Sequence, residues 1–305
     1  TIFIIYFIPY ALMVGELGSS FKELGGGVSS WILETIGPKM AYYAGWTYWV
    51  VHLPYISQKP QGAIIAGSWA IFQSNAISNI NPVALQISCL VVFLIGLLIA
   101  TKGMNPLKKI ATIAGTSMFV MSILFIILMI SAPAITGGNF IDIDWSLKTF
   151  MPTFDLKYFT SISILVFAVG GCEKISPYVN KMDEPSKGFP KGMITLAIMV
   201  AVCAILGTIS LGMMFDSNNI PQDLLTNGAY YAFQRLGEYY NVGNLFVILY
   251  AITNFIGQVS TLIISIDAPL RMLLESCDKE YMPRSMFKQN KYGAYTNGNK
   301  LIGVI

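Results

Sequence analysis

Long apolar runs constrain this chain more than any other feature of its sequence. They extend for about 18 to 25 residues, and a helix of that length crosses the hydrocarbon core of a bilayer, which is about 30 Å thick. Only 11% of the residues are charged and 54% are hydrophobic, whereas an ordinary soluble domain is about 25% charged. The sequence therefore predicts an all-α, polytopic membrane protein and excludes a soluble globule, a disordered chain, a coiled coil and a collagen-like rod.

Gly, Pro, Asn and clustered charges interrupt the apolar runs, and this pattern predicts seven membrane-spanning segments and the first turn of an eighth. The predicted segments are residues 1–20, 40–72, 83–101, 109–133, 158–180, 191–215 and 243–276, with the eighth beginning at 301. In the long connection before the seventh segment, residues 221–240 form either a short surface helix or a plain loop. We expect a single transmembrane domain over residues 1–305, incomplete at both ends.

The basic residues are divided unequally between alternating loops. One set of loops carries 15 of the 19 Lys and Arg residues, namely Lys22, Lys39, Lys102, Lys108, Lys109, Lys174, Lys181, Lys187, Lys191, Arg271, Lys279, Arg284, Lys288, Lys291 and Lys300. The other set carries Lys148, Lys157 and Arg235. Because positively charged loops stay in the cytoplasm, the first span is predicted to run inwards, and we expect one helix to precede Thr1.

The fifth predicted span contains the sequence FAVGGCEKISPYVNKMDEP, which places Gly170, Gly171 and Glu173 in an apolar run. This pattern predicts two half-helices, 158–168 and 173–181, each about 15 Å long, with a break near the membrane midplane. Unwound backbone at that depth must be buried in protein or line a cavity, and half-helix ends suit the carboxylate and ammonium groups of a zwitterion. The alternative is a glycine-lined helix crossing, in which Glu173 makes a structural hydrogen bond.

The second predicted span carries a polar stripe, because His52, Tyr55, Lys59, Gly62 and Ala66 recur at helical spacing on one face. We expect this face to point inwards. Lys59 could neutralise a substrate carboxylate or carry a proton, or it could extend to the outer interface from a long, tilted helix. His52 is either a proton relay or a hydrogen-bonded packing residue.

The seventh predicted span carries hydroxyl groups within an apolar helix. Ser260 and Thr261 could coordinate a cation or a substrate, or they could bond back to carbonyl groups of their own helix. Asp267 and Arg271 stand four residues apart, so they are predicted to pair.

No motif for enzymatic chemistry occurs: HExxH, GxSxG and GxxxxGK[ST] are all missing, and one His cannot supply a His-rich metal site. Neither a metal nor a cofactor is expected. The net charge is only +3, so no nucleic-acid partner is expected. The four cysteines lack metal-ligand or disulfide spacing and are predicted to be free thiols. They are Cys89, Cys172, Cys203 and Cys277.

Three stretches carry a resemblance to a known family. They are GELGSSFKELGGGVSSWILETIGPKMAYYAGW, GGCEKISPYVNKMDEPSKGFPKG and DAPLRMLLESCDKEYMP. In this order they resemble the region after the second helix, the broken sixth helix and the end of the eighth helix of the amino acid-polyamine-organocation transporters, and within these the glutamate/GABA antiporter branch. The resemblance covers nearly the whole chain.

The resemblance implies a twelve-helix transporter with a five-plus-five inverted repeat, of which this chain holds helices two to eight and the start of the ninth. Residues 170–172 would face the amino group of the substrate, Phe167 would close over the site, and Glu173 would belong to the inner gate or the proton route. The predicted substrate-binding residues are Phe167, Ala168, Gly170, Gly171, Cys172, Ser260 and Thr261. The predicted gating or proton-coupling residues are Glu173, Lys59, His52 and Tyr55.

The sequence departs from the family pattern in its GGC break, in Lys59, which has no counterpart, and in residues 109–133, which lack a mid-membrane lysine. The predicted function is secondary active transport of amino acids or related amines across the plasma membrane by alternating access, through exchange or coupling to protons. The first alternative is a membrane sensor that binds an amino acid without transporting it. The second is a channel, for which polar pore rings would be expected.

Overall fold

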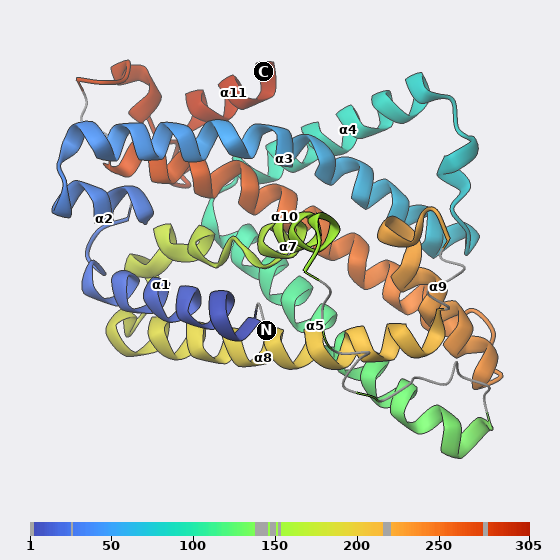
Figure 1. Ribbon diagram of the computed structural model, residues 1–305. Helices are drawn as coiled ribbons and strands as arrows, with labels where there is room; N and C mark the ends of the chain where they lie inside the picture. The colour runs from blue at the N-terminus through green and yellow to red at the C-terminus, as the bar shows by residue number, and fades with distance from the viewer. Residues whose placement is uncertain are drawn as a thin grey trace. The chain divides into compact units, whose positions relative to one another are not determined.

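The computed structural model describes residues 3–25, 27–137, 146, 151, 154–215, 221–276 and 280–305, and nearly all of these residues are helical (Figure 1). Among them, the one isolated β-bridge joins Gln289 and Tyr295. The elements are η1 (Phe3–Phe7), α1 (Ile8–Ser20), α2 (Val28–Thr35), α3 (Pro38–Phe72), η2 (Ala76–Asn79), α4 (Pro82–Ala100), α5 (Met104–Thr136), α7 (Leu156–Val169), η3 (Cys172–Lys181), α8 (Pro185–Met214), α9 (Leu224–Tyr239), α10 (Leu245–Ser276), η4 (Arg284–Phe287) and α11 (Thr296–Val304). The predicted all-α class is confirmed.

Four of the described helices are long and apolar enough to cross a membrane. They are Pro82–Ala100, Met104–Ile135, Pro185–Met214 and Leu245–Ser276, and they confirm the third, fourth, sixth and seventh predicted segments. On α4, side chains such as Ile87, Leu90 and Leu98 are exposed. This is the expected state of a helix surface that faces lipid rather than water.

The other three predicted segments are helical but differ from a plain apolar span. The first is short, because α1 has 13 residues after the five-residue π-helical turn η1. The second forms α3, whose 35 residues include His52, Lys59 and the prolines Pro54 and Pro60, so polar groups dilute its apolar content. The fifth is interrupted, as described below.

The connections contain more helix than the sequence predicted. Residues 224–239 form α9, so the helix alternative for residues 221–240 is confirmed over these residues. The connection after the first span contains α2, which was not predicted, and α11 begins at Thr296 rather than at 301. Residues 216–220, Lys148 and Cys277 lie outside the described residues.

The chain forms two compact units, each assembled from three stretches. The first unit consists of Thr1–Trp49, Asp142–Ile205 and Ala268–Pro283, and the second of Val50–Ile141, Leu206–Asp267 and Arg284–Ile305. The single domain over residues 1–305 stays a prediction.

In the first unit, glycines bring α1 close to α8. A Cβ atom on Gly15 would lie 3.2 Å from the Cβ of Met193, and one on Gly18 would overlap the ring of Phe189. Val14 packs in one cluster with Met193 and Phe189. Small residues at such a crossing allow the dense packing that holds helices together in a membrane, where the hydrophobic effect between helices is weak.

In the second unit, an aromatic and polar cluster fixes α9 against α3 and α10. The rings of Trp69 and Tyr230 stack with centroids 5.0 Å apart. The indole Nε1 of Trp69 donates to Oδ1 of buried Asn227 at 2.9 Å, and Nδ2 of Asn254 donates to the hydroxyl of Tyr230 at 2.7 Å. Because these buried groups satisfy one another, α9 has a defined position in the unit.

Asp223 completes this cluster at the start of α9. Its Oδ2 accepts hydrogen bonds from the hydroxyl of Tyr231 at 2.7 Å and from Nδ2 of Asn227 at 2.9 Å. The hydrogen bond from Tyr231 lowers the pKa of Asp223. Burial and the same hydrogen bond raise the pKa of Tyr231 to about 12, so its hydroxyl remains a donor at neutral pH.

We predict that Asp223→Asn lowers the stability of the protein at pH 7 by about 1 kcal/mol, the scale of a hydrogen bond to a charged acceptor that water still reaches. Because the pKa of Asp223 is lowered in the folded state, its contribution is present above the ordinary carboxyl pKa of about 3.9 and is lost as the pH falls through the folded-state pKa. Thermal unfolding in detergent should therefore separate the variant from the wild type at pH 7, and the difference should shrink as the pH falls below the ordinary carboxyl pKa of about 3.9.

Tyr231→Phe should reproduce the loss at pH 7, because it removes the main donor to Asp223. Glu238→Gln serves as the control, since Glu238 is exposed on the same helix. An unfolding midpoint for Asp223→Asn equal to that of the wild type at pH 7 would contradict the prediction.

Candidate functional site

The predicted break in the fifth span is present at Gly170 and Gly171. Helix α7 ends at Val169, Gly170 is extended with φ −66° and ψ 160°, and Gly171 has φ +107° before η3 begins at Cys172. A positive φ is open to Gly and strained for other residues. The break is therefore determined locally, by two glycines, which weaken a helix, and by one backbone conformation that favours Gly.

The second half of the broken span is a 3-10 helix rather than the expected α-helix. Pro177 has no N–H group, so it cannot donate the α-helical hydrogen bond to the carbonyl of Glu173. The hydroxyl of Ser176 instead donates to this carbonyl at 2.6 Å. The side chains of Ser176, Pro177 and Val179 are buried, so packing holds this half in place.

The carboxylate of Glu173, two residues after the break, is the centre of the candidate site. It accepts a hydrogen bond from the hydroxyl of Tyr48 at 2.8 Å and another from the hydroxyl of Tyr10. Tyr10 belongs to α1 and Tyr48 to α3, so one carboxylate joins three elements of the first unit. Each of the two carboxylate oxygens therefore has a neutral hydroxyl donor.

The two tyrosines were not predicted to belong to the site. Both lie in apolar helices, where a Tyr is expected to pack its ring, and only the long-range contact with Glu173 identifies them. Cys172 is half-buried and packs with Tyr10 against the apolar clusters of this unit. Tyr6 stacks on Tyr10 with centroids 5.7 Å apart.

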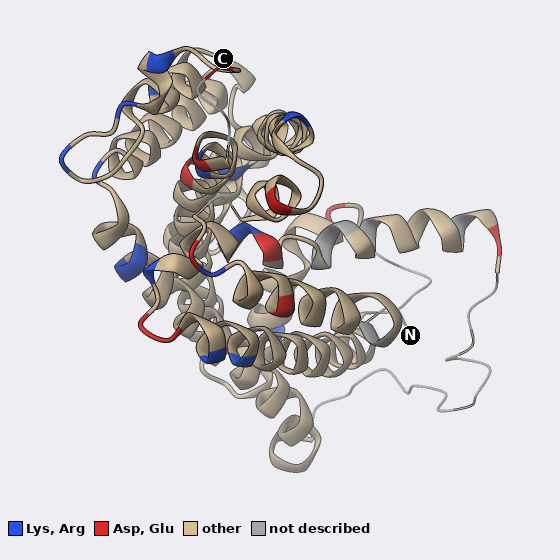
Figure 2. Cartoon of the chain, turned by 90° about the vertical axis from the view of Figure 1, so that its left-hand side faces the viewer, with Lys and Arg blue, Asp and Glu red and all other residues tan. Residues whose placement is uncertain are grey.

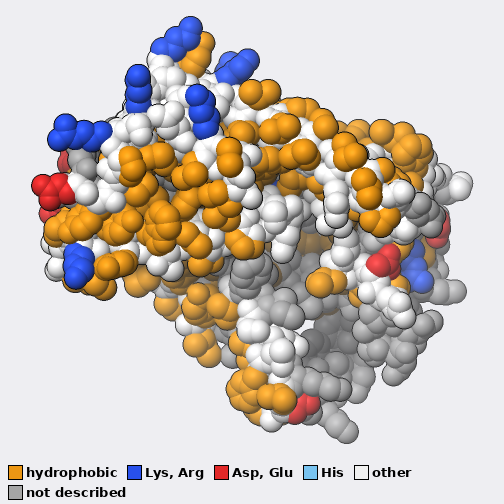
Figure 3. All heavy atoms as spheres, turned by 90° about the horizontal axis from the view of Figure 1, so that it is seen from above, with side chains coloured by type: hydrophobic (Ala, Val, Ile, Leu, Met, Phe, Trp, Pro, Cys, Tyr) orange, Lys and Arg blue, Asp and Glu red, His pale blue; other side chains and the backbone are white. Residues whose placement is uncertain are grey.

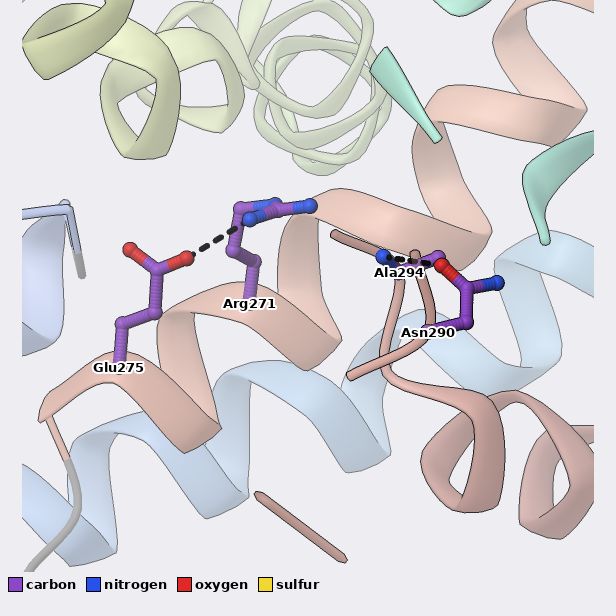
Figure 4. Close-up of polar contacts among 4 residues, drawn as sticks. All are labelled: Arg271, Glu275, Asn290 and Ala294. Carbon is purple, nitrogen blue, oxygen red and sulfur yellow. Dashed lines mark hydrogen bonds and ion pairs between the residues drawn. The ribbon is translucent and has the colours of Figure 1, made fainter. Parts of the chain in front are cut away.

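An ion pair on α10 lies beside the second half of the broken helix. Nη1 of Arg271 donates to Oε1 of Glu275 at 2.8 Å, as the dashed line in Figure 4 shows. The guanidinium carbon of Arg271 lies 5.8 Å from the centroid of Tyr178 in η3. A Cβ atom on Gly25 would overlap the carboxylate of Glu275 and lie 2.8 Å from Nδ2 of Asn180. The loop after α1, η3 and the end of α10 are thus packed together. The predicted pairing of Arg271 with Asp267 stays a prediction.

The predicted polar stripe of the second span forms a group of its own in the second unit. The rings of His52 and Tyr55 meet edge to face with centroids 6.1 Å apart, and Nζ of Lys59 lies 4.3 Å from the centroid of Tyr55. Further along, Gly62 faces Gln258 of α10, and Ala66 is fully buried. The shared face is confirmed. A cation over an aromatic ring is a stabilising contact in itself, and the role of Lys59 in transport stays a prediction.

The remaining predicted residues differ in how far the structure describes them. The hydroxyl of Thr261 donates to the carbonyl of Gly257 at 2.9 Å, which is the bond back to its own helix that the sequence analysis left open. Ser260 is 5% exposed. Phe167 and Ala168 lie in the last turn of α7, and their side chains are outside the described part of the chain.

We predict that Gly171→Ala destabilises the protein by about 1 to 2 kcal/mol, the energy that a side chain adds at a positive φ. No neighbour would obstruct the added Cβ atom, so the backbone conformation alone causes the loss. Gly192→Ala in α8 is the matched control, because its Cβ atom also meets open space and its φ is ordinary. It should be neutral or stabilising by up to about 1 kcal/mol. Thermal unfolding midpoints in detergent would measure both, and equal midpoints would contradict the prediction.

Known proteins match the chain along its full length. A family model described as amino acid permease matches residues 1–305. The aspartate/glutamate permease AcaP of Lactococcus lactis subsp. cremoris (strain MG1363) is 52% identical over 304 residues, which are 99% of this chain and 62% of that protein. The chain thus spans less than two thirds of this relative.

More distant relatives show similar coverage. The inner membrane transporter YjeM of Escherichia coli (strain K12) is 24% identical over 95% of this chain and 63% of its own length. The glutamate/gamma-aminobutyrate antiporter of Lactococcus lactis subsp. lactis (strain IL1403) is 22% identical over 95% of this chain and 57% of its own length.

These matches confirm the family resemblance that the three sequence stretches indicated. Together with the apolar helices, they make the chain part of a multi-pass protein of the plasma membrane. The chain belongs to the amino acid permease family.

Proposed function

We propose that the whole protein is a secondary transporter of amino acids, which moves its substrate by alternating access around the broken helix of α7 and η3. The observation that carries the proposal is the carboxylate of Glu173, held beside the break by hydroxyls from α1 and α3. A break of this kind leaves backbone groups for a ligand, and Glu173 supplies a charge whose contacts can change between states.

The two helix ends at the break suit a zwitterion. The carboxyl end of α7, at Val169, carries a partial negative charge, and the amino end of η3, at Cys172, carries a partial positive charge. A substrate ammonium group fits the first, as the resemblance implies for residues 170–172. Since the relative AcaP is named an aspartate/glutamate permease, aspartate and glutamate are the first substrates to test.

Glu173 is proposed to act as a gate. With both hydroxyl contacts made, it joins η3 to α1 and α3, which resists movement of η3. Protonation of Glu173, or pairing with a substrate ammonium, weakens these contacts and releases η3. Protons are therefore a proposed coupling ion, with exchange of amino acids as the other mode.

The test of transport uses the full-length protein in proteoliposomes. Labelled aspartate and glutamate should enter vesicles that are preloaded with unlabelled amino acids or amines, or vesicles under an inward proton gradient. Entry that requires an internal substrate would establish exchange, whereas entry that follows the gradient would establish proton coupling. Saturable binding without entry under either condition would show a sensor and contradict the proposal.

For the gate, we predict that Glu173→Gln lowers the uptake rate at least about tenfold, because it removes a charge used in the transport cycle. Tyr48→Phe should lower the rate in the same direction, because it removes a donor to Glu173 that contributes about 1.5 to 3 kcal/mol. Tyr43→Phe is the matched control, since Tyr43 lies on the same helix and is 51% exposed; it should transport like the wild type. If both site variants take up substrate at the wild-type rate, Glu173 has no part in the mechanism, even where the wild type is found to transport.

A further inference from the structure

Two segments of the second unit lie together at the ends of membrane-spanning helices. Nδ2 of Asn290, in the loop between η4 and α11, donates to the carbonyl of Thr101 at 2.7 Å. A Cβ atom on Gly103 would lie 3.0 Å from the backbone carbon of Tyr292. The turn between α4 and α5 therefore lies against the loop that precedes α11.

These two segments concentrate the positive charge of the chain. Residues 101–110 and 284–305 contain no Asp or Glu and seven basic residues. The basic residues are Lys102, Lys108, Lys109, Arg284, Lys288, Lys291 and Lys300. The whole chain has 19 basic and 16 acidic residues, so the rest of it holds 12 basic and 16 acidic residues, a net charge of −4. Other loops with several lysines also carry acids, such as Asp183 and Glu184 beside Lys181 and Lys187.

The basic side chains are available at the surface. All seven are exposed. Figure 2 shows basic positions along the loop before α11, and Figure 3 shows Lys and Arg side chains gathered at one edge of a largely apolar face. Tyr292 is 54% exposed, and Nζ of Lys291 lies 5.0 Å from its ring centroid.

The position of this surface, at the ends of membrane-spanning helices, indicates which kind of partner can reach it. The turn at residues 101–103 joins α4 to α5, and both helices are long and apolar enough to cross a membrane. The basic residues therefore stand at the depth of the lipid headgroups, where an exposed Tyr is also favoured. A cluster of four to eight basic residues next to a membrane helix attracts anionic lipids, each residue adding to the binding.

We propose that residues 101–109 and 284–300 form a binding surface for the headgroups of anionic phospholipids. The lysine ammonium groups and the Arg284 guanidinium bind the headgroup phosphates, and Tyr292 lies among the headgroups. This surface does not depend on the proposed transport function, since it lies outside the residues assigned to the substrate and the gate.

The test measures lipid binding rather than transport. The full-length protein in detergent is titrated with an equimolar mixture of phosphatidylglycerol and phosphatidylcholine, and the bound lipids are counted by native mass spectrometry. Lys108→Gln, Lys109→Gln, Lys288→Gln and Lys291→Gln are combined in one variant. The matched control combines Lys39→Gln, Lys181→Gln, Lys187→Gln and Lys191→Gln, which are also exposed and make the same change of charge.

The wild type should prefer phosphatidylglycerol, and the first variant should lose at least about tenfold in apparent affinity for it, because each neutralised charge is expected to weaken binding about fivefold. The control should retain the affinity within about twofold, and salt at about 0.5 M should remove the preference in the wild type. Equal losses in both variants would show general attraction to net charge and overturn the proposal. Full displacement of the lipid by inorganic phosphate would also overturn it, by showing a site for free anions.

Discussion

The absence of water inside a bilayer is the constraint on which this structure depends. Every backbone N–H and C=O group at that depth must find a partner in the protein, and helices provide this for most of the described chain. The interruption at Gly170 and Gly171 is therefore expensive, and the chain compensates around it with side chains. The hydroxyl of Ser176 bonds the carbonyl that Pro177 cannot reach, and apolar clusters cover this half of the span.

The same constraint explains how a carboxylate is kept inside the first unit. A charge at that depth needs donors or a counter-ion, and a nearby cation would fix the charge state of Glu173. Tyr10 and Tyr48 instead supply neutral donors. The contacts can therefore form and break with modest changes in energy, which is what the proposed gate requires.

The sequence predicted those features that local chemistry determines. Consecutive glycines beside Glu173 located the break, and helical spacing placed His52, Tyr55 and Lys59 on one face. Features that depend on distant contacts were missed. Tyr48 lies 125 positions from Glu173 along the chain, and no periodicity relates them. Helix α2 was missed because it is short and lies between glycines, and the 3-10 form of η3 reflects the position of Pro177 together with tertiary packing.

The 3-10 geometry of η3 also sets how far this segment extends. A 3-10 helix rises about 2.0 Å per residue and an α-helix about 1.5 Å. The ten residues of η3 therefore span about 20 Å, whereas the same residues in an α-helix would span about 15 Å. With three residues per turn, Glu173, Ser176 and Val179 also share one side of η3. If η3 rewound into an α-helix, it would therefore shorten by about one α-helical turn. Glu173 would also rotate away from Ser176 and Val179, the buried residues that now share its side of the helix.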